Sequence, residues 1–195
     1  MEGEIFGKEP VMDNGANIYS RYLSGDDTAM GELVREYMDG LTVFLNSFTN
    51  NLSEAEELME ETFFRLAYKK PRYNGKSSFK TWLYSIARNL AIDSLRKRKG
   101  FTTVSVEECT DLSDSMDVEE QYITEERKII IHRAISKLRD EYRQVVCLIY
   151  LEGFSNAETA IIMKKSNRQI TNLLYQAKRA LKVELEKEGI TYAGL

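Results

Sequence analysis

The chain has 195 residues, with 31 acidic and 27 basic side chains, and its formal net charge is −4. This length is enough for two compact domains that each bury a core. Two cysteines and one histidine exclude a disulfide framework and a zinc site, so we expect a reduced, cytoplasmic protein with no metal and no cofactor. We find no signal segment and no apolar run of membrane-spanning length, and therefore expect no direct membrane insertion.

Charge is distributed unevenly along the chain. Residues 1–64 carry 3 basic and 14 acidic side chains, residues 65–100 carry 11 and 1, residues 101–126 carry 0 and 9, and residues 127–195 carry 13 and 7. The acidic average therefore hides two basic blocks. A concentrated basic block favours contact with nucleic acid.

The spacing of apolar residues predicts an all-α fold. Apolar side chains recur at intervals of three and four, and prolines occur only at positions 10 and 71. Residues 1–16 are glycine-rich and lack this periodicity, which predicts a flexible leader. A helical stripe then runs from residue 18 to about residue 49, with Gly40 a plausible point for a break.

A second helix is predicted to begin at Ser53. Ser53 and Glu56 have the spacing of a capping box, in which the serine side chain and the glutamate three residues later satisfy amides at the helix start. One face of this helix is apolar, and the other is acidic but interrupted by aromatic residues. An acidic face is often only solvated, whereas an exposed Phe64 favours a protein-binding surface. The candidate residues of that surface are Glu56, Glu57, Glu60, Glu61 and Phe64.

Residues 72–78 are predicted to form a loop because they are rich in glycine, asparagine and serine. The loop contains polar and aromatic groups that can contact an unstacked base. Ser78 can cap the next helix, which we expect over residues 79–99 and which ends in a basic cluster at residues 96–99. Basic residues also stabilise a helix C-terminus, so only the loop, Trp82 and the cluster together favour nucleic acid.

Residues 102–126 contain nine acidic side chains and no basic one. Such a segment buries little and repels itself, which predicts an extended, flexible linker. We therefore divide the chain into a leader (1–16), a first helical domain (17–100), an acidic linker (101–122), a second helical domain (123–186) and a C-terminal tail (187–195).

The second domain has the pattern of a helix-turn-helix. An amphipathic helix is predicted over residues 135–149, and Gly153 ends the pattern. Ser155 with Glu158, and Ser166 with Gln169, form two predicted capping boxes only eleven residues apart. Two short capped helices at this separation are typical of a helix-turn-helix.

The outward face of the last helix is rich in groups that can read bases. Asparagine, glutamine and arginine suit adenine or guanine edges in the major groove. The alternative is a face that is only solvated. The candidate DNA-reading residues are Arg168, Gln169, Thr171, Asn172, Tyr175, Gln176 and Arg179.

Several stretches resemble bacterial RNA polymerase sigma factors of the sigma-70 family, in particular the extracytoplasmic-function (ECF) type. EAEELMEETFFRL from Glu54 and FKTWLYSIARNLAIDSLRKRK from Phe79 are similar to the family's domain 2. LRDEYRQVV from Leu138, Glu158-Thr-Ala and QAKRAL from Gln176 are similar to its domain 4. The similarity covers about residues 20–100 and 123–186.

This resemblance implies a function for each surface. The chain would bind core RNA polymerase, with the acidic helix on the β′ clamp helices and domain 4 on the β flap, while the linker runs towards the active-site cleft. The last helix would read the −35 promoter element, and the loop and the helix after it would capture and melt the −10 element. The implied −10 residues are Arg72, Tyr73, Asn74, Lys76, Ser77, Phe79, Trp82, Arg88, Asn89, Arg96 and Arg98. An anti-sigma factor is the implied regulator, and no small-molecule substrate is implied.

The chain departs from the family pattern in its helix-turn-helix. Lys164 occupies a turn position where relatives usually carry glycine, and a left-handed non-glycine residue costs about 1 kcal/mol. Thr171 and Gln176 stand where several relatives have arginine, so the −35 preference cannot be transferred from them.

Two other classes of protein were weighed. A stand-alone helix-turn-helix regulator would bind duplex DNA tightly without polymerase, and a helical adaptor would show no salt-dependent affinity for nucleic acid. An enzyme is the least favoured class, since the acidic residues do not converge and no phosphate-binding glycine loop occurs.

Overall fold

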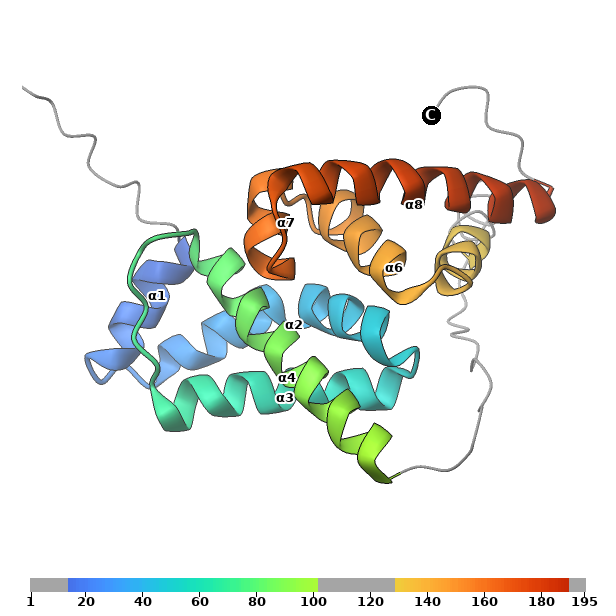
Figure 1. The fold of residues 1–195 in the computed structure, drawn as a ribbon. Helices are drawn as coiled ribbons and strands as arrows, with labels where there is room; N and C mark the ends of the chain where they lie inside the picture. Colours follow the sequence, from blue (N-terminus) through green and yellow to red (C-terminus); the bar gives the residue numbers. More distant parts are fainter. Residues whose placement is uncertain (1–13, 102–128, 190–195) are drawn as a thin grey trace, which may run out of the picture.

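The computed structural model describes residues 14–101 and 129–189, and every regular element in these ranges is helical (Figure 1). The N-terminal domain comprises α1 (Asn14–Leu23), α2 (Thr28–Thr49), α3 (Leu52–Lys69) and α4 (Phe79–Phe101). The C-terminal domain comprises a helical segment at residues 129–136, then α6 (Asp140–Val146), η1 (Cys147–Leu151), α7 (Asn156–Met163) and α8 (Asn167–Lys187). The structure does not describe the leader before residue 14, the predicted linker after Phe101, residues 123–128 of the predicted second domain, or the tail after residue 189.

Helix α1 begins earlier than the predicted domain boundary. Residues 14–16 were expected in the leader, but they form the first turn of α1, and Gly15 and Ala16 are buried. Tyr19 and Tyr22 on the same helix are also buried, and the Tyr22 hydroxyl donates to the carbonyl of Ala67 at 3.0 Å. The first helix is therefore part of the N-terminal core.

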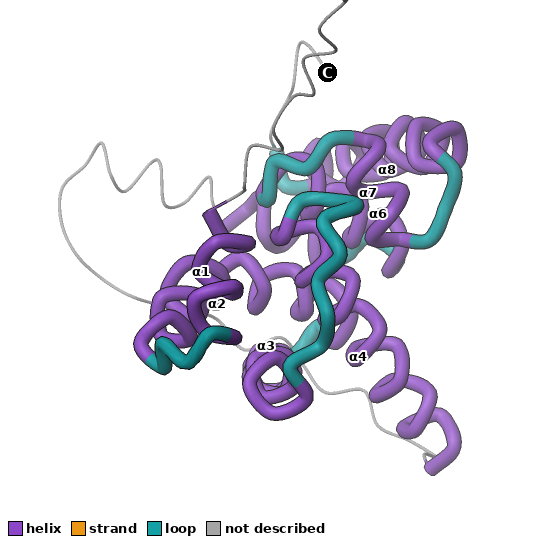
Figure 2. The backbone as a smooth tube through the Cα atoms, turned by 90° about the vertical axis from the view of Figure 1, so that its left-hand side faces the viewer, coloured by secondary structure: helices purple, strands orange, loops and turns teal. Residues whose placement is uncertain are grey.

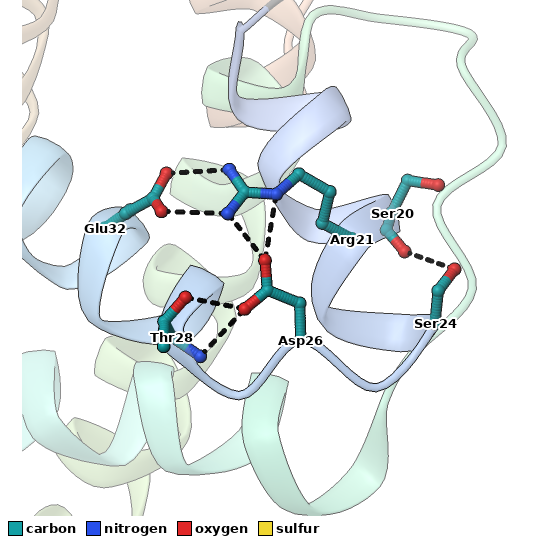
Figure 3. Close-up of polar contacts among 6 residues, drawn as sticks. All are labelled: Ser20, Arg21, Ser24, Asp26, Thr28 and Glu32. Carbon is teal, nitrogen blue, oxygen red and sulfur yellow. Dashed lines mark hydrogen bonds and ion pairs between the residues drawn. The ribbon is translucent and has the colours of Figure 1, made fainter.

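A polar network fixes the corner between α1 and α2 (Figure 3). The Arg21 guanidinium donates to Asp26 and, through two nitrogens at 3.0 Å each, to Glu32. Asp26 also accepts from the hydroxyl and the backbone amide of Thr28, at 2.5 and 3.1 Å. The hydrogen bond from Thr28, followed by that from Arg21, lowers the pKa of Asp26. Asp26 thus caps the start of α2 although it precedes the helix by two residues.

The break that Gly40 made plausible is absent, because α2 runs unbroken from Thr28 to Thr49. The predicted stripe over residues 18–49 is interrupted instead at residues 24–27, between α1 and α2. Glycine inside a helix costs about 1 kcal/mol relative to alanine, so its presence there needs another reason. A Cβ atom at position 40 would lie 2.5 Å from both the Tyr84 hydroxyl and a carboxylate oxygen of Glu152. Glycine here leaves room for the Tyr84 hydroxyl and the Glu152 carboxylate and is not part of a turn.

Helix α3 is capped by Asn51, which corrects the predicted capping box at Ser53. The Asn51 side chain accepts from the amide of Glu54 at 3.2 Å, and Leu52 is the first helical residue. The preceding Asn50 is left-handed, with φ 50°, and its amide donates to Asn46 and ends α2. The capping residue therefore lies two positions earlier than predicted, and asparagine caps as well as serine does.

The single helix predicted over residues 135–149 is broken at residues 137–139. The guanidinium of Arg143 donates to the carbonyls of Ser136 and Leu138 at 2.9 and 3.1 Å, and so satisfies the end of the first helical segment. After α6 the chain makes the π-helical turn η1, in which the Glu152 amide bonds to the carbonyl of Cys147 at 3.0 Å.

Helices α7 and α8 form the helix-turn-helix, and both predicted capping boxes are confirmed. The side chains of Ser155 and Ser166 accept from the backbone amides of Glu158 and Gln169. In return, the Glu158 and Gln169 side chains accept from the backbone amides of the two serines, at 3.0 and 2.7 Å. Lys164 adopts the left-handed conformation of the turn, with φ 54° and ψ 45°. The lysine therefore keeps the shape for which glycine is better suited.

The two domains pack directly on one another. Helix α7 lies against α4, and α6 lies against α2, so that α8 runs across the side opposite α3 in Figure 1. Phe44, Phe79, Leu83 and Tyr84 of the N-terminal domain belong to the same buried apolar cluster as Leu148 of the C-terminal domain. The core is therefore continuous across the domain boundary.

Candidate nucleic-acid and protein interfaces

The last helix, α8, presents one continuous polar face. Its apolar face is buried through Ile170, Leu173 and Ala177. All seven candidate residues on the other side are exposed: Arg168, Gln169, Thr171, Asn172, Tyr175, Gln176 and Arg179. The structure thus brings together the whole predicted set.

The side chains on this face make different hydrogen bonds and ring contacts. Gln169 accepts from the Ser166 amide, so its carbonyl oxygen belongs to the capping box. Thr171 donates to the carbonyl of Asn167 at 3.1 Å. The Arg179 guanidinium carbon lies 5.9 Å from the centre of the Tyr175 ring, which is 60% exposed. Asn172 and Gln176, one turn apart, carry the amide groups best suited to base edges.

A second candidate surface is the loop that joins α3 to α4, shown in Figure 2 as a long extended segment. The Tyr19 hydroxyl donates to the carbonyl of Pro71 at 2.8 Å and fixes the start of the loop. Asn74 accepts from the amide of Lys76 at 3.1 Å across Gly75, whose φ of +66° suits glycine. Three polar residues of the predicted set are exposed on this loop: Arg72, Asn74 and Lys76.

An aromatic cluster packs between the loop and the start of α4. Tyr73 and Trp82 have ring centres 5.3 Å apart, and both also contact Phe79, at 5.6 and 5.4 Å. Tyr73 and Trp82 are half-buried, and the Tyr73 hydroxyl donates to the carbonyl of Ser77. Phe79 is fully buried. This burial corrects the expectation that Phe79 contacts DNA, because its ring instead packs beneath Tyr73 and Trp82.

Helix α4 holds the remaining members of the predicted set in different environments. Ser78 caps the helix by accepting from the Thr81 amide at 3.2 Å, as predicted. Asn89 is half-buried, and Arg96 is exposed near the basic end. Arg98 forms an ion pair with Glu54 of α3, so its charge is shared with the acidic helix.

Arg88 lies beside the C-terminal domain. Its side chain is partly buried, and its Nε atom has no hydrogen-bond partner. Burial lowers the pKa of Arg88, and the nearby carboxylate of Glu141 in α6 opposes this shift. In this arrangement the second domain therefore faces Arg88.

The exposed face of α3 combines carboxylates with two stacked aromatic rings. Phe64 and Tyr68 are 58% and 77% exposed, and their rings are nearly parallel, 5.6 Å apart with an interplanar angle of 6°. The four predicted glutamates around them are also exposed: Glu56, Glu57, Glu60 and Glu61. An aromatic pair in open solvent within an acidic rim is the pattern of a protein-binding surface. Tyr68 was not among the predicted residues of this surface, although its i, i+4 spacing from Phe64 was an available signal.

Other kinds of site have little support in the described residues. Within residues 14–101 and 129–189, no cluster of three or more histidine, cysteine, aspartate or glutamate side chains could hold a metal ion. Cys147 is buried, and burial raises the pKa of its thiol. A buried thiol of this kind is an unreactive core residue. None of the helices described is both long and apolar enough to cross a membrane.

Both domains of the chain match known protein families. Residues 33–101 match the family described as Sigma-70 region 2, and residues 128–181 match Sigma-70, region 4. The chain is 33% identical over 151 residues to the ECF RNA polymerase sigma factor SigM of Bacillus subtilis, which covers 77% of this chain and 91% of SigM. The chain belongs to the ECF group of the sigma-70 family. This sigma factor is also 28% identical to SigW of the same organism, over 83% of this chain and 91% of SigW.

Two solved structures show the same fold. CnrH in complex with the cytosolic domain of CnrY superposes with a TM-score of 0.62 at 19% identity, over 88% of this sigma factor and 96% of that chain. The sigma factor RpoE, in complex with the anti-sigma factor NepR from Bartonella quintana, gives 0.62 at 23% identity, over 80% and 96%. The chain's matches to both sigma-70 regions and to SigM show that it is a non-enzymatic initiation factor that binds RNA polymerase and DNA and directs promoter recognition. Region 2 includes α2 to α4, and region 4 includes α6 to α8.

Proposed function

We propose that the exposed face of α8 reads the −35 element in the major groove. The observation that carries this proposal is the helix-turn-helix itself, in which two capping boxes and a left-handed turn fix α8 while its whole polar face stays exposed. Asn172 and Gln176 would contact base edges, and Arg168 and Arg179 would contact phosphates.

The loop at residues 72–78 and the first turns of α4 would capture the −10 element. Tyr73 and Trp82 are held half-exposed by the buried ring of Phe79, which suits them to stack against an unpaired base. Extruding a base costs a few kcal/mol, and stacking with edge hydrogen bonds can offset that cost. Arg72, Asn74, Lys76 and Ser77 would contact the strand from the loop. Helix α4 would contact the same strand through Asn89 and Arg96. Arg88 and Arg98 would also contact the strand once they are released from their present neighbours.

The acidic aromatic face of α3 would bind the β′ clamp helices of core polymerase, while region 4 would bind the β flap. The segment between the domains would run through the polymerase towards its active-site cleft, as its charge suggests. We place the leader, linker and tail boundaries as predicted from the sequence, except that α1 begins at Asn14. A sigma factor that works with bacterial polymerase acts in the cytoplasm.

An anti-sigma factor is the proposed regulator. RpoE, which has the same fold, was solved in complex with the anti-sigma factor NepR, and this supports a partner of the same kind here.

Transcription from genomic fragments tests the proposal. Core polymerase is incubated with the fragments, with and without this sigma factor, and transcript 5′ ends are mapped. We expect new start sites that share two spaced upstream motifs. The variant N172A/Q176A should alter or weaken the upstream motif while it leaves the downstream one intact, and Lys182→Ala, further along α8, is the matched control. An unchanged upstream motif in N172A/Q176A would exclude α8 as its reader, and tight duplex binding without polymerase would favour the stand-alone regulator.

A further inference from the structure

The side chain of Gln169 is held in one orientation by the start of its own helix, α8. Its amide group contacts the backbone N–H of Ser166 at 2.7 Å, while the Ser166 hydroxyl accepts from the Gln169 backbone amide at 3.2 Å. A backbone N–H can only donate, so the atom of Gln169 that faces Ser166 is the amide oxygen and not the amide nitrogen. The capping box therefore fixes which end of the glutamine faces the backbone.

The fixed oxygen leaves the side-chain nitrogen as the group that Gln169 presents outward. The oxygen and the nitrogen of an amide lie on opposite sides of the carbon that carries them, so the nitrogen is turned away from Ser166. Gln169 is exposed, and no hydrogen bond among the described residues uses this nitrogen. In the same part of the chain, the side-chain amides of Asn172 and Gln176 have neither end bonded, and each can both donate and accept.

Gln169 lies on the same stripe of α8 as Asn172 and Gln176. The three exposed residues are spaced i, i+3 and i+7, which brings them to one face of the helix. In a helix-turn-helix, the N-terminal residues of the second helix contact base edges. The rise from Gln169 to Asn172 is about 4.5 Å, close to the spacing of about 3.4 Å between stacked base pairs. The two side chains are therefore placed to face neighbouring base pairs.

A group that only donates does not fit every base in the major groove. Guanine presents two acceptors there, N7 and O6, and thymine presents one, O4. Adenine presents an amino group beside its N7 acceptor, and cytosine presents only an amino group. A glutamine nitrogen that faces either amino group would bring donor against donor. The restrained Gln169 is thus matched to guanine, although an unrestrained glutamine suits adenine.

We propose that Gln169 determines the base at one position of the −35 element: held by the Ser166 amide, it reads a guanine through its side-chain nitrogen, beside the base pair that Asn172 reads. Ser166 is then a positioning residue, because its backbone restricts what Gln169 can accept. The proposal rests on the assignment of α8 as the −35 reader made above, and it gives a base preference to a residue to which that assignment gave none.

The substitution Q169E reverses the presented group from donor to acceptor. Glutamate completes the equivalent capping box of α7, where Glu158 accepts from the Ser155 amide at 3.0 Å, so the variant should stay folded. Its outward oxygen suits the amino group of cytosine. The matched control is N167D, which adds the same charge to the first turn of α8 at an exposed residue outside the capping box.

A second substitution, S166P, tests the restraint itself. Proline has no backbone N–H, so the Gln169 oxygen is released, and the Ser166 φ of −76° is one that proline adopts. A released Gln169 can donate and accept, and so can pair with adenine. The matched control is S166A, which loses the same hydroxyl but keeps the backbone N–H. Thermal unfolding followed by circular dichroism establishes that each variant is folded.

The readout is transcription by the holoenzyme from promoters in which each position of the mapped −35 element is randomised. A barcode in the transcript identifies each promoter, so the four bases compete in one reaction. For the parent chain we expect one position at which guanine is favoured over adenine by about fivefold or more. Q169E should shift this position to cytosine, and S166P should raise adenine to the level of guanine. N167D and S166A should keep the parent preference.

Identical base preferences in the parent chain, Q169E and S166P would overturn the role of Gln169. A shift in Q169E without a gain of adenine in S166P would overturn the restraint by Ser166. The variant N172A/Q176A separates these failures from that of the underlying assignment. If it alters the upstream motif and Q169E does not, α8 is the reader and only the role of Gln169 is wrong. If neither variant alters the motif, both proposals fail.

Discussion

Arg143 in α6 donates from its Nε atom to the carbonyl of Ser47 in α2 at 2.8 Å, across 96 positions of sequence. The same guanidinium binds the carbonyls of Ser136 and Leu138 and the carboxylate of Asp140. The residue is only 8% exposed. One side chain thus closes a helix end in region 4 and joins that region to region 2.

Replacing Arg143 with methionine should therefore destabilise the protein strongly. The substitution leaves buried carbonyls without donors, and we expect the free energy of unfolding to fall by about 2–4 kcal/mol. Asp140→Asn is the control, because the Asp140 side chain is 71% exposed and the loss of such a pair costs less than about 1 kcal/mol. Urea unfolding followed by circular dichroism measures both. Equal losses in the two variants would show that the buried carbonyl bonds contribute little.

The aromatic pair on α3 gives a prediction about polymerase. Phe64→Ala should weaken binding to core polymerase by about 10- to 100-fold, because an aromatic group at the centre of an interface contributes about 1.4–2.8 kcal/mol. The stability of the free protein should hardly change, since Phe64 is 58% exposed. Val43→Ala, an exposed apolar truncation on α2, is the matched control. Titration of labelled sigma factor with core polymerase gives the affinities, and wild-type affinity in Phe64→Ala would remove α3 as the docking helix.

The turn of the helix-turn-helix carries a strain that glycine would relieve. Lys164 has φ 54°, where a Cβ atom is unfavourable. Lys164→Gly should raise the free energy of unfolding by up to about 1 kcal/mol, the gain being reduced by the greater freedom of glycine in the unfolded chain. Lys164→Ala keeps the Cβ atom and should give no such gain. Thermal unfolding of the two variants separates backbone strain from any effect of the lysine charge.

Local rules predicted much of this protein correctly. The capping boxes at Ser155 and Ser166, the helix-turn-helix and the exposed face of α8 depend on short-range spacing, and the structure has them where the sequence indicated. The resemblance to sigma factors was likewise confirmed by the matches to regions 2 and 4. The residue roles assigned to DNA and polymerase remain predictions.

The errors arose where side-chain packing, which apolar spacing does not encode, decides the local structure. The break after residue 136 preserves the apolar spacing, and it is stabilised by Arg143, several residues further on. Gly40 has the usual mark of a break, but its reason lies in Glu152, in the other domain. Phe79 has the position of a DNA-contacting residue in the family pattern, yet its ring is needed beneath Tyr73 and Trp82. The relation of Gly40 to Glu152 joins the two domains, and the other two depend on where side chains point in three dimensions, which the spacing of apolar residues does not show.

The carboxylate of Glu158 makes the stability of the protein depend on pH. Burial alone would raise its pKa, but hydrogen bonds from Ser155, Thr81 and Ser78 outweigh burial and hold the pKa below its ordinary value. A carboxyl group whose pKa is lower in the folded than in the unfolded chain stabilises the folded state at higher pH. That contribution is complete above the unfolded pKa of about 4.5 and is lost as the pH falls through the folded value.

Glu158→Gln should therefore be less stable than the parent chain at pH 7, and the difference should shrink as the pH falls below about 4.5. Glutamine cannot gain a proton, so the acid limb of its stability curve should be shallower than that of the parent. Urea unfolding at pH 7, 5, 4 and 3.5 provides the two curves. Glu186→Gln, on the exposed side of α8, should give a curve parallel to that of the parent chain. A stability difference between Glu158→Gln and the parent that stays constant from pH 7 to pH 3.5 would show that the Glu158 carboxylate gains nothing from its three hydroxyl neighbours.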